Sequence, residues 1–285
     1  MDRIVEWLKE NLNIGEWVEL VVVWIQDNLG ALLDGIAWIL RLLTDTFEAS
    51  LLAVPEWLFC AVLVALSWWR VGWKFGIFAL LALGVILGME LWQQTVQTLS
   101  LVLAASLVAL VVGLPIGIAM ARNDTIEWLV RPVLDFMQTM PPFVYLIPAA
   151  IFFGLGKVPG AIATVVFAMP PAVRLTNLGI RQVNKEQIEA GLAFGCTRRQ
   201  LLTKVQLPLA MPSIMAGVNQ TIMLALSMVV IASMIGAGGL GNTVLTGIQR
   251  LNVGLGFEGG LGVVILAILL DRITQSFGPR RRAST

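Results

Sequence analysis

Long apolar runs, separated by short polar segments, occupy most of the chain after its first 50 residues. A helix that crosses a hydrocarbon core of about 30 Å needs roughly 20 predominantly apolar residues. The runs predict seven membrane-spanning helices, at residues 53–70, 73–92, 95–121, 133–155, 158–178, 207–235 and 259–277. The pattern therefore predicts an all-α, polytopic helical membrane protein.

The first 50 residues follow a different pattern. Apolar residues such as Trp17, Leu20 and Trp24 recur at helical spacing, while Asp27 and Asp34 interrupt any long apolar run. This amphipathic pattern is typical of a helix that lies in the plane of the membrane interface. We expect residues 1–50 to lie along the outer interface, and we expect them to be retained because they lack the features of a signal peptide.

Basic residues divide unequally between the two sides of the predicted spans. If the polar loop at residues 180–206 is cytoplasmic, most of the 19 Lys and Arg residues lie on the cytoplasmic side. The positive-inside rule then places the N-terminus outside and the C-terminus in the cytoplasm. The predicted organisation is an interfacial segment at 1–50, two helices at 51–92, a membrane core at 93–278 and a basic cytoplasmic tail at 279–285.

The composition excludes several classes of function. Hydrophobic residues make up 58% of the chain and the mean hydropathy is +0.85, which excludes a water-soluble domain. The net charge of +1 argues against a nucleic-acid partner. Tryptophan is concentrated near the N-terminus, with nine of ten residues at or before Trp92. This concentration fits either an aromatic cage for a quaternary ammonium or a belt of tryptophans at the membrane interface, and we favour the interfacial belt.

The residues also limit the chemistry. With no histidine, the chain has no Ser-His or Cys-His pair and no histidine metal site, so we expect no catalytic or metal residues. Cys60 lies in an apolar run and Cys196 in the polar loop, so we expect no disulfide. The G-x-G-x-x-G spacing at Gly236–Gly241 follows an apolar helix and precedes no βαβ unit, so we interpret it as a chain reversal.

The sequence also limits how this chain could power transport. The centres of the predicted spans contain almost no charged residues, which disfavours an ion-coupled carrier, although Na⁺ coupling through backbone carbonyls stays open. The chain has no G-x-x-x-x-G-K-[ST] loop. If ATP is used, a different subunit must bind it.

Prolines interrupt two consecutive predicted spans, with Pro141, Pro142 and Pro148 in the fourth and Pro170 and Pro171 in the fifth. Each proline removes a backbone donor and bends its helix, either as an ordinary kink or as the lining of a pathway. Two Pro-Pro pairs in neighbouring spans favour a gate or translocation surface. The candidate pathway residues are Gln138, Thr139, Pro141, Pro142, Tyr145 and Asn219.

The polar loop keeps helical periodicity from Asn184 to Val205. Gly195 is a natural helix stop, and the next four residues, Thr197 to Gln200, fit a capping box that starts a second short helix. The pattern therefore predicts a two-helix hook, and helices this short need a partner surface. The alternative is a solvated loop whose arginines only set the membrane topology, and the residue pattern alone does not decide between the two.

The loop carries a resemblance to a known family. Glu189-Ala190-Gly191, Gly195 and Val205-x-Leu207-Pro208 resemble the EAA loop of ABC importer permeases, with Gly191 in place of an alanine and Val205 in place of an isoleucine. Other segments, such as GLPIGIAMAR and VQLPLAMPSIMAGVNQT, resemble the glycine betaine/proline/choline permeases. This similarity extends from about Gly88 to the end of the last span.

The resemblance implies a homodimeric type I ABC importer permease in a bacterial inner membrane. Two cytoplasmic ATPase subunits would bind ATP and Mg²⁺, an outer binding protein would deliver the substrate, and this chain would bind no cofactor. The substrate would be glycine betaine, proline betaine, choline or proline. The alternatives are a permease for another small solute, an ATP-independent channel and a membrane enzyme. The residues expected to couple this chain to the ATPase are Glu189, Ala190, Gly191, Gly195, Arg198, Arg199, Leu207 and Pro208.

Overall fold

The computed structural model describes residues 14–278, which form helices and no strand. The all-α prediction is confirmed. Residues 1–13 and the predicted basic tail at 279–285 lie outside the described part. The helices are α2 (Ile14–Leu52), α3 (Glu56–Arg70), α4 (Trp73–Gly88), α5 (Trp92–Arg122), α6 (Asp124–Thr139), α7 (Pro142–Phe153), α8 (Lys157–Arg181), α9 (Lys185–Ala193), α10 (Arg198–Gln200), η1 (Leu201–Gln206), α11 (Leu207–Ser233), α12 (Gly239–Gln249) and α13 (Val253–Phe277).

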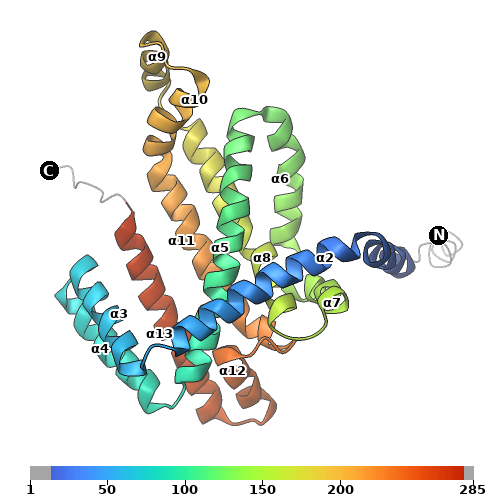
Figure 1. Ribbon diagram of the computed structural model, residues 1–285, viewed down its shortest axis with the longest axis vertical. Helices are drawn as coiled ribbons and strands as arrows, with labels where there is room; N and C mark the ends of the chain where they lie inside the picture. The colour runs from blue at the N-terminus through green and yellow to red at the C-terminus, as the bar shows by residue number, and fades with distance from the viewer. Residues whose placement is uncertain (1–13, 279–285) are drawn as a thin grey trace, which may run out of the picture.

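The core of the bundle is made by α5, α8 and α11, which run along its long axis (Figure 1). Small residues allow these helices to approach closely. Close packing is common between membrane helices, because in lipid the hydrophobic effect does not drive helices together. At Gly117 of α5, an added Cβ would lie 2.6 Å from the carbonyl oxygen of Val173 in α8. We call the end that carries α9, α10 and η1 the hook end, and the end that carries α12 the α12 end.

Five helices in the described part of the chain are long and apolar enough to cross a membrane, and a bent pair would make a sixth. The five are Gly15–Leu52, Trp92–Arg122, Lys157–Arg181, Arg198–Ser233 and Val253–Phe277. The prediction of seven spans exceeds these five or six, because the predicted spans at 53–70 and 73–92 are α3 and α4, of only 15 and 16 residues. These two helices are only about 23 Å long, because Pro55 precedes α3 and a tight turn at Gly72 separates the pair.

The prediction of one helix over residues 133–155 is wrong. The chain forms α6 and α7 instead, and their axes differ in direction by 99°. The break falls at Met140 and Pro141, both in extended conformation. Residues that precede a proline are pushed out of the helical region, and two consecutive prolines enforce this at both positions. The bend gives this segment the form of a broken span or a re-entrant loop.

Helix α2 lies across the α12 end of the bundle rather than along its axis (Figure 1). Leu40 is buried in one cluster with Leu101 of α5, Ala161 of α8 and Leu240 of α12. The Gln26 amide donates to the carbonyl of Ile151, at 3.2 Å, where α7 ends. Although α2 qualifies as a membrane span by length and composition, its contacts are concentrated at one end of the bundle.

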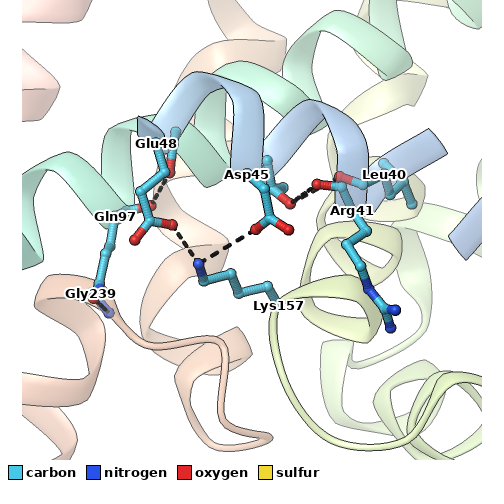
Figure 2. A network of polar contacts seen from close by, with 9 residues as sticks. Leu40, Arg41, Asp45, Glu48, Gln97, Lys157 and Gly239 are labelled. Atoms are coloured by element: carbon cyan, nitrogen blue, oxygen red, sulfur yellow. Dashed lines mark hydrogen bonds and ion pairs between the residues drawn. The ribbon is translucent and has the colours of Figure 1, made fainter. Parts of the chain in front are cut away.

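An ion-pair network attaches α2 to the start of α8 (Figure 2). Lys157 Nζ lies between the carboxylates of Glu48, to which it donates a hydrogen bond, and Asp45, at 3.7 Å. Nearby, the Gly239 N–H donates to Gln97 Oε1 at 3.1 Å. The Leu240 N–H donates to Thr98 Oγ1 at 2.8 Å. The glycine-rich stretch at 236–241 is therefore a chain reversal held against α5, as expected.

Candidate functional site: the hook and the bend

The hook, residues 184–206, begins with a capped helix and a sharp reversal. The Asn184 side chain accepts a hydrogen bond from the Glu186 N–H at 3.2 Å and caps α9. At the other end Gly195 has φ +78°, its N–H donates to Leu192 O at 2.9 Å, and the Cys196 N–H donates to Gly191 O at 3.0 Å. These are the two hydrogen bonds of a Schellman motif. The predicted stop at Gly195 is confirmed.

The predicted capping box is also present. The Thr197 hydroxyl accepts from the Gln200 N–H at 3.3 Å, and Gln200 Oε1 accepts from the Thr197 N–H at 2.8 Å. Two of the free donors at the start of the second helix are thereby satisfied. Since all of these hydrogen bonds join residues within the loop, the local sequence determines the shape of the hook.

The second hook helix continues into α11. The predicted helix after Thr197 and the predicted span from residue 207 are both present, but they are not separate, because they join in one helix from Arg198 to Ser233. Pro208 has no N–H, and its ring cannot approach the carbonyl of Lys204. The helix accommodates Pro208 by widening over Leu201–Gln206, where the Leu207 N–H donates to Leu202 O, five residues earlier. Such wide turns are frequent at functional sites.

Apolar contacts hold the two arms of the hook together but leave its tip uncovered. A Cβ at Gly191 would lie 2.9 Å from Leu201 Cδ1, so the glycine allows α9 to rest on η1. Leu202 is buried and joins Ile180 and Ala210 at the base. At the tip Leu192 is exposed, and Phe194 is 90% exposed. The sequence analysis did not single out Phe194, although an aromatic residue in a polar loop was visible there.

The structure brings the predicted coupling residues together on the hook. Five of these residues are exposed: Glu189, Ala190, Gly195, Arg198 and Arg199. None of the three charged residues in this set forms an ion pair with any residue in 14–278. Leu207 and Pro208 lie at the base, where Leu207 packs against the cluster around Leu202. Cys196 in the hook and Cys60 in α3 are both free thiols, as expected.

An arginine clamp, missed by the sequence analysis, ties three helices together below the hook. Arg181 Nη2 donates to Met120 O at 2.8 Å and to Asp124 Oδ1 at 2.6 Å, and it forms an ion pair with Glu127 Oε2 at 2.9 Å. Its Nε donates to Asn177 at 3.0 Å. The clamp joins the end of α8 to the end of α5 and the start of α6. Further along α6, Asp135 pairs with Arg174 at 2.5 Å.

The bend between α6 and α7 collects most of the predicted pathway residues. Gln138 and Thr139 end α6, Pro141 and Pro142 make the break, and Tyr145 follows on α7. Tyr145 is buried beside Ala163 and Met228. Its hydroxyl has no hydrogen-bond partner among residues 14–278.

Asn219, the remaining predicted pathway residue, is not near the bend. Its amide donates to Asp271 at 2.8 Å, and its Oδ1 accepts from the Thr274 hydroxyl at 2.7 Å. These contacts place Asn219 in a polar cluster between α11 and α13, because both of its partners belong to α13.

The fold and the protruding hook are those of a helical membrane transport subunit. Residues 113–283 match the family described as binding-protein-dependent transport system inner membrane component. Since this match covers more than half of the chain, the protein belongs to that family. Membership supports a multi-pass inner-membrane permease over the alternatives of a channel and a membrane enzyme.

Curated relatives agree with this assignment. The chain is 51% identical over 263 residues to the glycine betaine/carnitine transport permease protein of Listeria monocytogenes, which covers 91% of this chain and 89% of that protein. It is 47% identical to the glycine betaine/proline betaine transport system permease protein of Escherichia coli, covering 96% and 78%. It is 44% identical to the glycine betaine transport system permease protein of Bacillus subtilis, covering 99% of both chains.

A solved structure supports the fold. An inward-facing form of the MetNI methionine ABC transporter matches with a TM-score of 0.57 at 23% identity, covering 63% of this chain and 92% of that one. At this identity the similarity shows the fold alone, which is that of a type I ABC importer permease.

Proposed function

We propose that this chain is the membrane-spanning subunit of an ATP-driven importer for quaternary-amine compatible solutes: glycine betaine, proline betaine, choline or proline. The observation that carries the proposal is the similarity, at 44–51% identity and over most of the chain, to three permeases named for glycine betaine. A permease named for choline is more distant, at 32% identity over 65% of the chain. We therefore rank glycine betaine first among the substrates.

In this proposal the hook docks into a cytoplasmic ATPase subunit, which binds ATP and Mg²⁺. The contact surface is supplied by the exposed Phe194 and by the charges of Glu189, Arg198 and Arg199, which form no ion pair among the described residues. Gly195 sets the angle between the two arms, while Leu207 and Pro208 connect the hook to α11. The continuous helix from Arg198 to Ser233, with its widened turn at Leu201–Gln206, supports this role, because a movement of the hook would be transmitted directly into the membrane core.

The proposed assembly is a homodimer of this chain with two ATPase subunits and a binding protein on the outer side. The exposed apolar side chains of Phe136, Phe143 and Ile147 on α6 and α7 support a contact with a second copy. The excess of basic residues on the hook side supports a cytoplasmic hook and C-terminus and an outer N-terminus. Helix α2 would then lie along the outer interface, where Lys157 ties it to α8.

Substrate would pass the bend between α6 and α7. Backbone groups freed by Pro141 and Pro142, the side chains of Gln138 and Thr139 and the unpartnered Tyr145 hydroxyl offer polar contacts there. Asn219 would contribute from its separate position on α11. Such contacts are weak, which suits a path that releases a zwitterion or a cation rather than storing it.

The test is to purify the complex with its binding protein and ATPase, reconstitute it, and measure ATP hydrolysis with each ligand in turn. Glycine betaine should stimulate hydrolysis and drive uptake, and methionine should do neither. Stimulation by methionine but by no quaternary amine or proline would overturn the substrate assignment. Uptake in liposomes that lack the ATPase would instead indicate a channel.

A further inference from the structure

A groove of about 640 Å³ opens between the α3–α4 turn and the last turns of α13. Trp73, Lys74 and Phe78 line it from α4, and Ile268 and Arg272 line it from α13. The groove belongs to neither the hook nor the bend. It lies toward the hook end of the bundle, because α13 ends there and the α3–α4 turn packs against that end, where Arg70 reaches Ser276.

The groove carries positive charge that no acidic residue in the described part of the chain neutralises. Lys74 and Arg272 form no ion pair within residues 14–278, and no carboxylate lines the groove. The adjacent Asp271 is engaged elsewhere, because its carboxylate accepts from Asn219 at 2.8 Å and from Gln275 at 2.6 Å. Two basic side chains therefore line one space in which no acidic side chain of residues 14–278 takes part.

A third basic residue, Arg70, lies next to the groove and is not among the residues that line it. Arg70 Nη2 donates to the carbonyl of Ser276 at 3.0 Å, and its guanidinium lies 4.3 Å from the centre of the Phe277 ring. These contacts fix the end of α3 against the end of α13. Because Arg70 is already used in this way, Lys74 and Arg272 are the groups left to bind a ligand.

The surroundings of the groove are those of a membrane interface. Trp69 is 77% exposed and Trp73 is 57% exposed beside it, and exposed tryptophans are typical of headgroup depth. Further along α4, away from the hook end, Leu80 and Leu81 are exposed as well. A ligand with a charged head and long apolar chains could contact the basic groove, the tryptophans and the apolar face of α4 together. A free anion would contact only the basic groove.

The backbone adds donors at the same place. Gly72 precedes α4 with φ +139°, and no side chain caps the helix. The first N–H groups of a helix are left without intrahelical partners and favour a phosphate. They supplement the two basic side chains, which supply the specificity for negative charge.

We propose that this groove binds the phosphate headgroup of an anionic phospholipid from the leaflet at the hook end. Lys74 and Arg272 contact the phosphate, Trp73 lies at the level of the glycerol backbone, and the acyl chains follow the exposed apolar face of α4. A zwitterionic lipid presents the same phosphate together with a cation that the two basic residues repel. The groove therefore prefers phosphatidylglycerol to phosphatidylcholine.

The experiment uses the complete transporter, reconstituted in vesicles of phosphatidylglycerol and phosphatidylcholine in equal amounts. The complex is extracted in mild detergent, and the lipids that stay bound are counted by native mass spectrometry. Wild type should retain phosphatidylglycerol preferentially. Lys74→Gln/Arg272→Gln should lower that preference by about thirtyfold, or ~2 kcal/mol, at ~1 kcal/mol for each basic residue near an anionic surface.

Two further variants serve as controls. Arg122→Gln/Arg131→Gln removes the same charge from exposed residues outside the groove and should leave lipid retention unchanged. Lys74→Arg/Arg272→Lys keeps both charges and should retain the lipid. Equal retention of both lipids by wild type, or equal loss in the two Gln pairs, overturns the proposal. Displacement of the lipid by inorganic phosphate would show that the groove is a site for soluble anions, which also overturns it.

Discussion

At the scale of single residues, Gly195 sets the shape of the hook through its positive φ and its N–H. In Gly195→Pro the ring fixes φ near −65° and removes the donor to Leu192 O, so the reversal cannot form. We expect transport and substrate-stimulated ATP hydrolysis to be lost while the protein still inserts into the membrane. Gly195→Ala keeps the donor at a cost of about 1 kcal/mol and should retain most activity. If the proline variant took up substrate at the wild-type rate, the proposed role of Gly195 in coupling would be wrong.

Phe194 gives a second prediction at this scale. Because its side chain is 90% exposed, it contributes little to the stability of the permease alone. If the hook docks as proposed, Phe194→Ala should weaken ATPase binding by at least about tenfold, as aromatic anchors at interfaces do. Co-purification and titration of the ATPase measure this change. Phe257→Ala removes a 69% exposed phenylalanine near the α12 end and is the matched control; an equal effect of both would contradict the docking.

At the scale of helices, the arginine clamp holds α6 in place. Leu134 is the only fully buried residue of α6, with Ile126, Val130 and Met137 partly buried around it, so polar contacts add to a small apolar interface. Arg181→Gln breaks contacts to Met120, Asp124 and Glu127, and we expect it to lower the free energy of unfolding by about 1–2 kcal/mol. Arg174→Gln breaks one pair, in which both partners are at least 40% exposed, and should cost less than about 1 kcal/mol. Thermal unfolding in detergent compares the two, and a larger loss for Arg174→Gln would contradict this ranking.

The sequence predicts a feature of these helices well when the interactions that form it join residues close together in the chain. The Gly195 stop and the Thr197 capping box were predictable because every bond involved lies within a few residues. Pro141 and Pro142 predicted a bend, but they did not predict its angle of 99°, because that angle depends on how α7 packs on α8. The Arg181 clamp joins residues up to 61 positions apart, and no local pattern marks it. The widened turn before Pro208 was missed because apolar content alone does not show that one helix continues into another.

At the scale of the whole molecule, the proposed orientation can be tested with a native thiol. Cys196 lies in the hook and is partly accessible, whereas Cys60 is buried in α3. In cells that express the permease without its ATPase, a membrane-impermeant thiol reagent should label Cys196 only after the membrane is opened. Cys196→Ser should abolish the labelling. Labelling of Cys196 in intact cells would place the hook outside and reverse the proposed topology.

The continuity of the hook with α11 also bears on how motion crosses the membrane. The helix from Arg198 to Ser233 has 36 residues, and at 1.5 Å per residue it is a rod about 54 Å long. A tilt of about 5° at one end of such a rod displaces the other end by about 5 Å. At that far end Ser233 binds the carbonyl of Gly238 at 3.0 Å, next to the reversal held by Gln97. If the hook moves this helix as proposed, a few degrees of rotation at the hook would displace the contacts around Ser233, and the length of one helix would set the size of that displacement.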